Sequence, residues 1–306
     1  MKFQLSISML FLGSFIFPCQ MQSKKMIRVH CDVNKTLICT DAVQGKDLEE
    51  MINGILAEFT FYKWDGKNIQ SYYAFVSAKL LRENSDSFLA SEKFKKLRRE
   101  LLKGFPQYLE RYPELQSSYQ ATKDKMTALL SSEEMVIFPS FIKLIGWLNT
   151  CHKDHYAIYL RTFGQDLPKV MSLIEKKTEL KFAAQGEFNG RALSLAEESY
   201  LDFFRNSKNN YGIKDDFEYW KSKGFQAEGG KPFPVGLNAE DIEILLDDNA
   251  DDEVKPIICP VNSEGKLLNT AELLKKGIIV AVNPMEAILD EDYFIKKVQA
   301  RINSNH

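Results

Sequence analysis

Apolar, β-branched runs alternate with amphipathic helical patterns over much of the chain, and this alternation constrains the fold most strongly. The strand-like runs lie at residues 27–33, 155–162, 242–246, 257–260 and 278–284, and helical patterns such as residues 166–179 separate them. Strands that alternate with helices indicate βαβ units and a parallel sheet. We therefore predict an α/β fold whose ligand site lies at the carboxyl ends of its strands.

The 306 residues suffice for one large domain or for a core with an inserted subdomain. Residues 45–134 carry helical patterns punctuated by Pro106 and Pro113, and we predict a helical module inserted after the first strand. The core then comprises residues 26–44 and 135–306. Within it, residues 180–230 show the least regular pattern, and residues 286–303 are predicted to form one closing helix.

Charge and composition argue against a nucleic-acid partner. The formal net charge is −2, and the 44% of apolar residues is ordinary for a globular protein. Nucleic-acid-binding domains usually carry a basic face or an overall basic charge. One basic run lies on a polar helical stretch, and we interpret it as a solvated helix face; its residues are Lys93, Lys95, Lys96, Arg98 and Arg99.

The N-terminal segment, residues 1–25, has two interpretations. Residues 5–17 form an apolar run of secretory-signal length, which is too short to span a bilayer comfortably. Met21 and Met26 lie just before the first strand, so a start assigned too far upstream is the alternative. The first interpretation implies a secreted or periplasmic protein and the second a cytoplasmic one. Neither interpretation implies a membrane span in the mature protein.

The five cysteines match no zinc-binding pattern. Their number is odd, and their spacing fits no template of paired ligands. Cys31 and Cys39 lie within and just after the first strand, so we expect both to be small apolar core residues.

Polar groups follow three of the strand-like runs. The first run leads into Asp32 and Asn34, the second ends at Thr162, and the third ends at Asp247 and Asp248. The carboxyl ends of parallel strands meet at one edge of the sheet, so these carboxylates would repel one another there. A hard divalent cation relieves such repulsion, and Mg²⁺ prefers one or two carboxylates with water. We therefore predict a Mg²⁺ site.

Simpler interpretations remain beside this prediction. Asp32 could simply be a turn residue, because Asp and Asn in the sequence Asp-Val-Asn-Lys-Thr favour turns. The acidic stretch 247–253 could be a solvated turn. An EF-hand is excluded, because its sixth and twelfth positions, counted from Asp247, hold Asp252 and Ile258 instead of Gly and Glu. Arg161 could contact an anion or form a structural ion pair.

The ordered set of strand-end residues resembles the haloacid dehalogenase (HAD) superfamily. Asp32 to Thr36, written DxNxT, is similar to the first motif of that superfamily, and Thr162 matches its second. Lys231, followed by Asp247 and Asp248, fits the order of its third and fourth motifs, with Lys221 and Lys223 as rival lysines. The resemblance covers the core and implies a Rossmann-like, three-layer α/β fold with a parallel sheet. Residues 45–134 would then be an α-helical cap.

The resemblance also implies a role for each matching residue. Asp32 would attack phosphorus and form an aspartyl-phosphate. Thr162 would bind the phosphoryl group, and Lys231 would balance its charge. Asp247 or Asp248 would bind Mg²⁺ together with Asp32 and the backbone carbonyl of Asn34. The expected function is Mg²⁺-dependent hydrolysis of a small phosphorylated molecule, which the cap would select.

Asn34 departs from the pattern of the superfamily. Its phosphatases carry a second aspartate at this position as general acid and base, and an amide cannot exchange a proton in this way. Such proton transfer contributes about 10²–10⁴ in rate. The alternative function is therefore a catalytically weak or inactive relative that binds or scaffolds.

Overall fold

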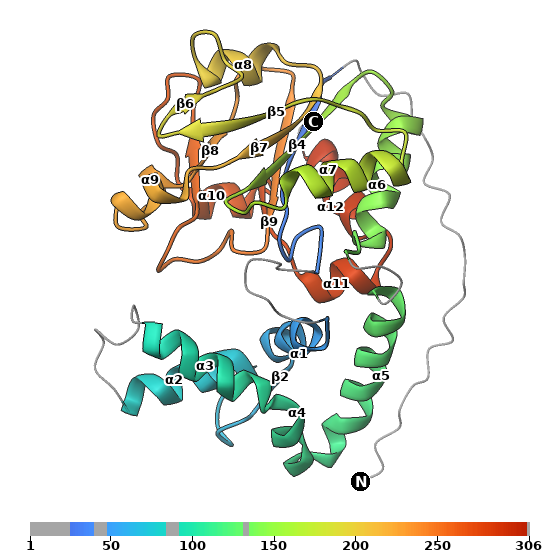
Figure 1. Cartoon of the computed structure of the whole chain (residues 1–306), viewed down its shortest axis with the longest axis vertical. Coiled ribbons are helices and arrows are strands. Elements are labelled where there is room, and N and C mark those ends of the chain that lie inside the picture. Colours follow the sequence, from blue (N-terminus) through green and yellow to red (C-terminus); the bar gives the residue numbers. More distant parts are fainter. Residues whose placement is uncertain (1–24, 40–47, 84–91, 131–134, 305–306) are drawn as a thin grey trace.

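A seven-stranded sheet forms the centre of the protein in the computed structural model, which describes residues 25–39, 48–83, 92–130 and 135–304 (Figure 1). All neighbouring strands in this sheet pair in parallel except the edge pair β5 and β6. The predicted α/β fold with a mostly parallel sheet is confirmed, and it is compatible with a Rossmann-like fold. In spatial order the strands are β11 (Ile279–Ala281), β9 (Ile242–Asp247), β1 (Ile27–Asp32), β4 (Tyr156–Thr162), β7 (Asn210–Lys214), β5 (Phe182–Asn189) and β6 (Ala192–Leu193).

Helices flank this sheet. Prolines in the first turn help to start α6, α7 and α11, because their fixed φ suits a helix and their missing amide is not needed there. The helices of this part are α6 (Pro139–Cys151), α7 (Leu167–Lys177), α8 (Tyr200–Asn206), α9 (Phe217–Ser222), α10 (Thr270–Lys275), α11 (Pro284–Leu289) and α12 (Tyr293–Asn303).

Both faces of the central strand β1 are buried. Ile27, Val29 and Cys31 point to one face and join the apolar core that also contains residues of α6, α7 and α12. On the other face the His30 ring stacks on Tyr159, with ring centroids 4.6 Å apart. A strand covered on both faces explains the continuous apolar run in the sequence. The expectation that Cys31 and Cys39 are core residues is confirmed.

The sequence left one stretch of the core unassigned, and two expectations about the core are wrong. The irregular stretch 180–230 contains β5 and β7, two strands of the main sheet. The run at residues 257–260 is not in that sheet, because β10 (Ile258–Val261) pairs with β8 (Lys231–Pro234) in a separate parallel pair. The closing helix is two helices, α11 and α12, because the turn between them is held by the Asp290 carboxylate, which accepts from the Asp292 amide at 3.0 Å.

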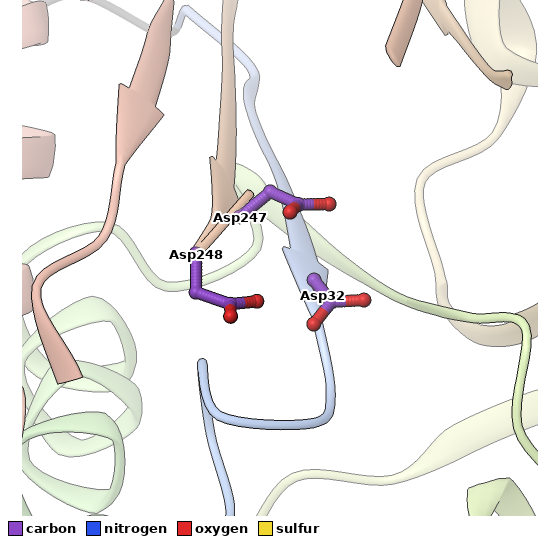
Figure 2. A group of neighbouring side chains, drawn as sticks. All are labelled: Asp32, Asp247 and Asp248. Carbon is purple, nitrogen blue, oxygen red and sulfur yellow. The ribbon is translucent and has the colours of Figure 1, made fainter. Parts of the chain in front are cut away.

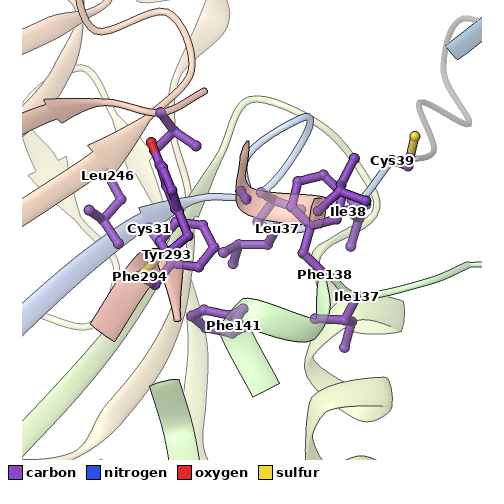
Figure 3. Close-up of a cluster of buried hydrophobic side chains, with 14 of the residues drawn as sticks. Cys31, Leu37, Ile38, Cys39, Ile137, Phe138, Phe141, Leu246, Tyr293 and Phe294 are labelled. Carbon is purple, nitrogen blue, oxygen red and sulfur yellow. The ribbon is translucent and has the colours of Figure 1, made fainter. Parts of the chain in front are cut away.

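The chain leaves and re-enters the core at one place. After β1 it turns back through Ile38, which forms an antiparallel bridge with Ile137, and the Phe138 amide donates to the Leu37 carbonyl at 2.8 Å. These side chains join the buried cluster that Figure 3 shows around Phe141 and Phe294. The segment between residues 39 and 135 is therefore connected to the core through two stretches of backbone that lie next to each other.

The inserted segment is mainly helical and lies together on one side of the sheet (Figure 1). Its helices contact the core through α11, which packs against α1 and α5. It also contains a short antiparallel pair, β2 and β3, that sequence patterns did not indicate. The elements are α1 (Leu48–Phe59), β2 (Phe61–Tyr62), β3 (Gln70–Ser71), α2 (Tyr72–Glu83), α3 (Glu92–Lys103), α4 (Phe105–Tyr108) and α5 (Pro113–Leu130).

The basic run on α3 is only partly a solvated face. Lys93 and Lys96 are exposed, as expected. Arg98 instead places its guanidinium 4.6 Å from the centre of the Tyr73 ring, and Arg99 pairs with Glu50 at 2.8 Å. The sequence could not show this, because the partners lie on other helices.

Within the described ranges, no helix combines the length and the apolar character needed to cross a membrane. The apolar run at residues 5–17 and the question of the true start lie outside these ranges.

Candidate metal and phosphate site

Three carboxylates meet at the carboxyl ends of two adjacent parallel strands. Asp32 is the last residue of β1, Asp247 is the last residue of β9, and Asp248 follows it. Each of the three offers an oxygen, and these oxygens all lie within 4.8 Å of one another. Figure 2 shows Asp247 and Asp248 facing Asp32 from the neighbouring strand. The structure therefore brings together the acids that strand-end reasoning had grouped.

Lys231 lies between two of these acids. Its Nζ donates to Asp32 Oδ1 at 2.5 Å and to Asp247 Oδ2 at 2.7 Å, and its side chain is 1% exposed. Lys231 is the first residue of β8. The rival lysines, Lys221 and Lys223, are exposed on and just after α9. Of these three lysines, Lys231 is the one in contact with the acids.

Burial and mutual repulsion set the electrostatics of the group. Burial raises the pKa of Asp32 against the opposing effect of Lys231, the neighbouring Asp247 adds to the rise, and the resulting pKa is about 7. Burial and then the charge of Asp32 raise the pKa of Asp248 well above its ordinary value. Burial by itself would lower the pKa of Lys231, but Asp247 and Asp32 raise it above its ordinary value. The lysine is therefore charged at neutral pH.

Thr36 holds Asp248 in place and was missed as a site residue. Its buried hydroxyl accepts from the Asp248 amide at 3.1 Å and lies 3.4 Å from Asp248 Oδ1. On the other strand, the Asn249 amide donates to Asp247 Oδ1 at 2.9 Å. The available signal for Thr36 was its place as the last residue of the DxNxT pattern.

Thr162 and Asn34 lie beside each other at the edge of the site. Thr162 ends β4, which pairs with β1 so that Arg161 is opposite Asp32. The Thr162 hydroxyl accepts from the Gly164 amide at 2.8 Å, which leaves its own proton available to donate. The Asn34 Oδ1 atom is buried and has no hydrogen-bond partner among the described residues. Both side chains therefore offer unused polar groups near the end of β1.

Arg161 forms the structural ion pair that was one of its two interpretations. Its fully buried guanidinium donates to both Asp215 oxygens and also to the Pro232 carbonyl, the latter at 2.8 Å. Asp215 carried no sequence signal. Because Pro232 follows Lys231 in β8, this pair helps to hold the strand that delivers the lysine.

The donor set fits a divalent cation. When all three carboxylates are ionised, the ammonium of Lys231 offsets one of their three negative charges, so two remain, which one divalent ion would balance. All the donors are oxygens, which suits hard cations such as Mg²⁺ and Ca²⁺. Asp32, Asp247 and Asp248 are therefore suited to hold Mg²⁺. Such an ion would offset the burial and the mutual repulsion that raise the pKa values of Asp32 and Asp248.

Comparison with known proteins shows no relative of this chain. No protein-family model, no curated protein and no solved structure matches it. An α/β fold of this kind hosts many unrelated chemistries, so the function has to follow from the side chains of the site.

Proposed function

We propose that the chain is a HAD-like, Mg²⁺-dependent phosphohydrolase that acts on a small phosphorylated molecule through an aspartyl-phosphate. The observation that carries this proposal is Lys231, which donates to Asp32 and Asp247 at the ends of adjacent parallel strands. A buried cation that is held on a strand-end carboxylate, beside two further acids, is suited to stabilise the charge that develops during phosphoryl transfer.

In this proposal Asp32 is the nucleophile. Its Oδ1 accepts from Lys231, so the other oxygen attacks phosphorus. Thr162 donates its hydroxyl proton to an oxygen of the phosphoryl group, and Lys231 balances the charge of the phosphorylated aspartate. Mg²⁺ held by Asp32, by Asp247 or Asp248 and by the Asn34 backbone carbonyl would neutralise charge on the transferring group.

The helical segment, residues 45–134, acts in this proposal as the substrate-selecting cap. Lys35, directly after Asn34, donates to Glu58 of α1 at 2.9 Å, which links the site loop to the inserted helices. Lys35 has φ +61°, a left-handed conformation that is uncommon outside glycine. The turn bond from its amide to the Ile38 carbonyl, at 2.9 Å, holds that conformation.

The test is a panel of phosphorylated small molecules, assayed with Mg²⁺ on the full chain and on Asp32→Asn. Turnover of at least one substrate by the wild-type protein, and its loss in Asp32→Asn, is the expected result. Equal turnover by both proteins, or none on the whole panel, would contradict the proposal. Asp251→Asn, a change in an exposed acid of the same loop, is the matched control.

A second candidate is a binding or scaffold protein that keeps the metal site without efficient turnover. The observation that favours it is Asn34, which cannot serve as general acid or base. If Asn34→Asp raises turnover sharply, only the proton-transfer group was missing and the enzyme proposal stands. If turnover stays absent while calorimetry shows Mg²⁺ binding, the binding role is favoured.

A further inference from the structure

Gly164 marks a point where side chains from three elements meet. A Cβ atom placed on Gly164 would lie 3.2 Å from Thr162 Oγ1, 3.3 Å from Asn34 Nδ2 and 3.7 Å from Asp166 Oδ2. Thr162 ends β4, Asn34 follows β1, and Asp166 directly precedes α7. One carboxylate oxygen of Asp166 and the amide nitrogen of Asn34 therefore face the same point beside Gly164.

The backbone of Asp166 is held in place by the start of α7. Its carbonyl accepts from the Val170 amide at 3.0 Å, and Pro168 in the first turn restricts the backbone further. A carboxylate on a helix start is positioned more reproducibly than one on a free loop. The backbone of Asp166 is thus fixed, and its carboxylate faces the same point beside Gly164 as the side chains of Thr162 and Asn34.

We propose that Asp166 is the general acid and base for phosphoryl transfer at Asp32, in the place where Asn34 provides only an amide. This inference rests on the proposed phosphohydrolase function. A carboxyl group can donate and then accept the proton, whereas an amide can do neither. In this view the acid–base group is supplied by the residue that precedes α7 and not by the loop after β1.

The proton balance of the two steps is as follows. In the first step Asp32 forms a bond to phosphorus, the bond from phosphorus to the ester oxygen breaks, and that oxygen takes the proton of the Asp166 carboxyl group. The alcohol leaves. In the second step the Asp166 carboxylate takes a proton from water as the water oxygen attacks phosphorus. The bond from phosphorus to Asp32 breaks, inorganic phosphate leaves, and both aspartates return to their starting states.

The test separates phosphorylation from hydrolysis by using labelled acetyl phosphate with Mg²⁺. Acetate is a good leaving group and needs no proton, so wild-type protein and Asp166→Asn are expected to form the phosphoenzyme at similar rates. Its breakdown needs a base. It is expected to be about 10²–10⁴-fold slower in Asp166→Asn. Asn34→Asp placed in the Asp166→Asn protein is expected to restore most of the breakdown rate, which a purely structural defect would not allow.

Asp292→Asn is the matched control, because Asp292 also directly precedes a helix, α12, and pairs there with Lys143 at 2.9 Å. It is expected to behave as wild type. If the phosphoenzyme of Asp166→Asn breaks down at the wild-type rate, the role of Asp166 is overturned while the phosphohydrolase proposal stands. If the wild-type protein forms no phosphoenzyme on Asp32, both proposals are overturned.

Discussion

Lys231 Nζ lies 2.5 Å from Asp32 Oδ1, although 199 positions separate the two residues in the chain. The contact crosses from β8, in the small parallel pair, to the end of β1 in the main sheet. Among the described residues, Lys231 is the cation that pairs with Asp32, and its side chain is fully buried. The stability of the site therefore depends on this one ammonium group.

Replacing Lys231 with Met is expected to destabilise the protein by about 3–5 kcal/mol, because it leaves buried carboxylates without their partner. Urea unfolding without metal measures this loss. Added Mg²⁺ is expected to stabilise Lys231→Met more than the wild-type protein, since binding to the folded state alone shifts the equilibrium. Lys221→Met, in an exposed residue of α9, is the control, and an equal loss there would contradict the assignment.

Asp248→Asn is expected to weaken Mg²⁺ binding by at least about 10-fold, because it removes one of the three charges that the ion offsets. Isothermal titration calorimetry measures the dissociation constant. Asp251→Asn, in the exposed part of the same loop, is expected to leave it unchanged. Similar weakening in both variants would point to a diffuse acidic attraction and not to a defined site.

Arg161→Met is expected to destabilise the protein by about 3–5 kcal/mol, because it leaves the buried Asp215 carboxylate without its ion-pair partner. The double variant Arg161→Met with Asp215→Leu is expected to recover much of this loss, because it replaces both buried charges by apolar groups. Thermal and urea unfolding of the single and double variants form the comparison. A double variant as unstable as the single one would show that the Pro232 contact dominates.

Glu243→Gln is expected to flatten the pH dependence of stability. Burial raises the pKa of Glu243 from 4.5 to about 7, and Arg28 only partly opposes this. Between these values the unfolded chain has lost the proton that the folded protein keeps, so stability falls as pH rises from about 4.5 to about 7. The variant removes a loss of up to about 3 kcal/mol, measured by urea unfolding across this range. Glu240→Gln, in an exposed residue, is expected to leave the slope unchanged.

Gly164→Ala is expected to lower turnover by about 10-fold or more while leaving Mg²⁺ affinity intact. The new methyl group would crowd Thr162 Oγ1 and Asn34 Nδ2, and small displacements of reacting groups carry large costs in rate. Gly146→Ala is the control, because a Cβ there meets nothing within 4 Å. Steady-state kinetics and calorimetry on both variants make the comparison. Loss of Mg²⁺ binding in Gly164→Ala would contradict our assignment, in which Gly164 lies next to Thr162, the proposed phosphate-binding residue.

The local order of the core was accessible from the sequence because periodicity is a short-range property. The runs that became β1, β4 and β9 were recognised, and their ends placed Asp32, Thr162 and Asp247 at one edge of the sheet. β5 and β7 were missed, since residues 180–230 carry a weak pattern and their place in the sheet comes from packing against their neighbours.

The sequence by itself determined that strand-end acids would gather at the edge of a parallel sheet, because parallel strands all present their carboxyl ends there. Only the tertiary structure decided which lysine reaches those acids, that Thr36 holds Asp248, and that Asp166 and Asn34 face one point beside Gly164. The physical reason is that these contacts join separate elements. Lys231 reaches Asp32 because β8 packs through Phe233 against the face of the sheet that also carries Leu245, and no local pattern encodes that packing.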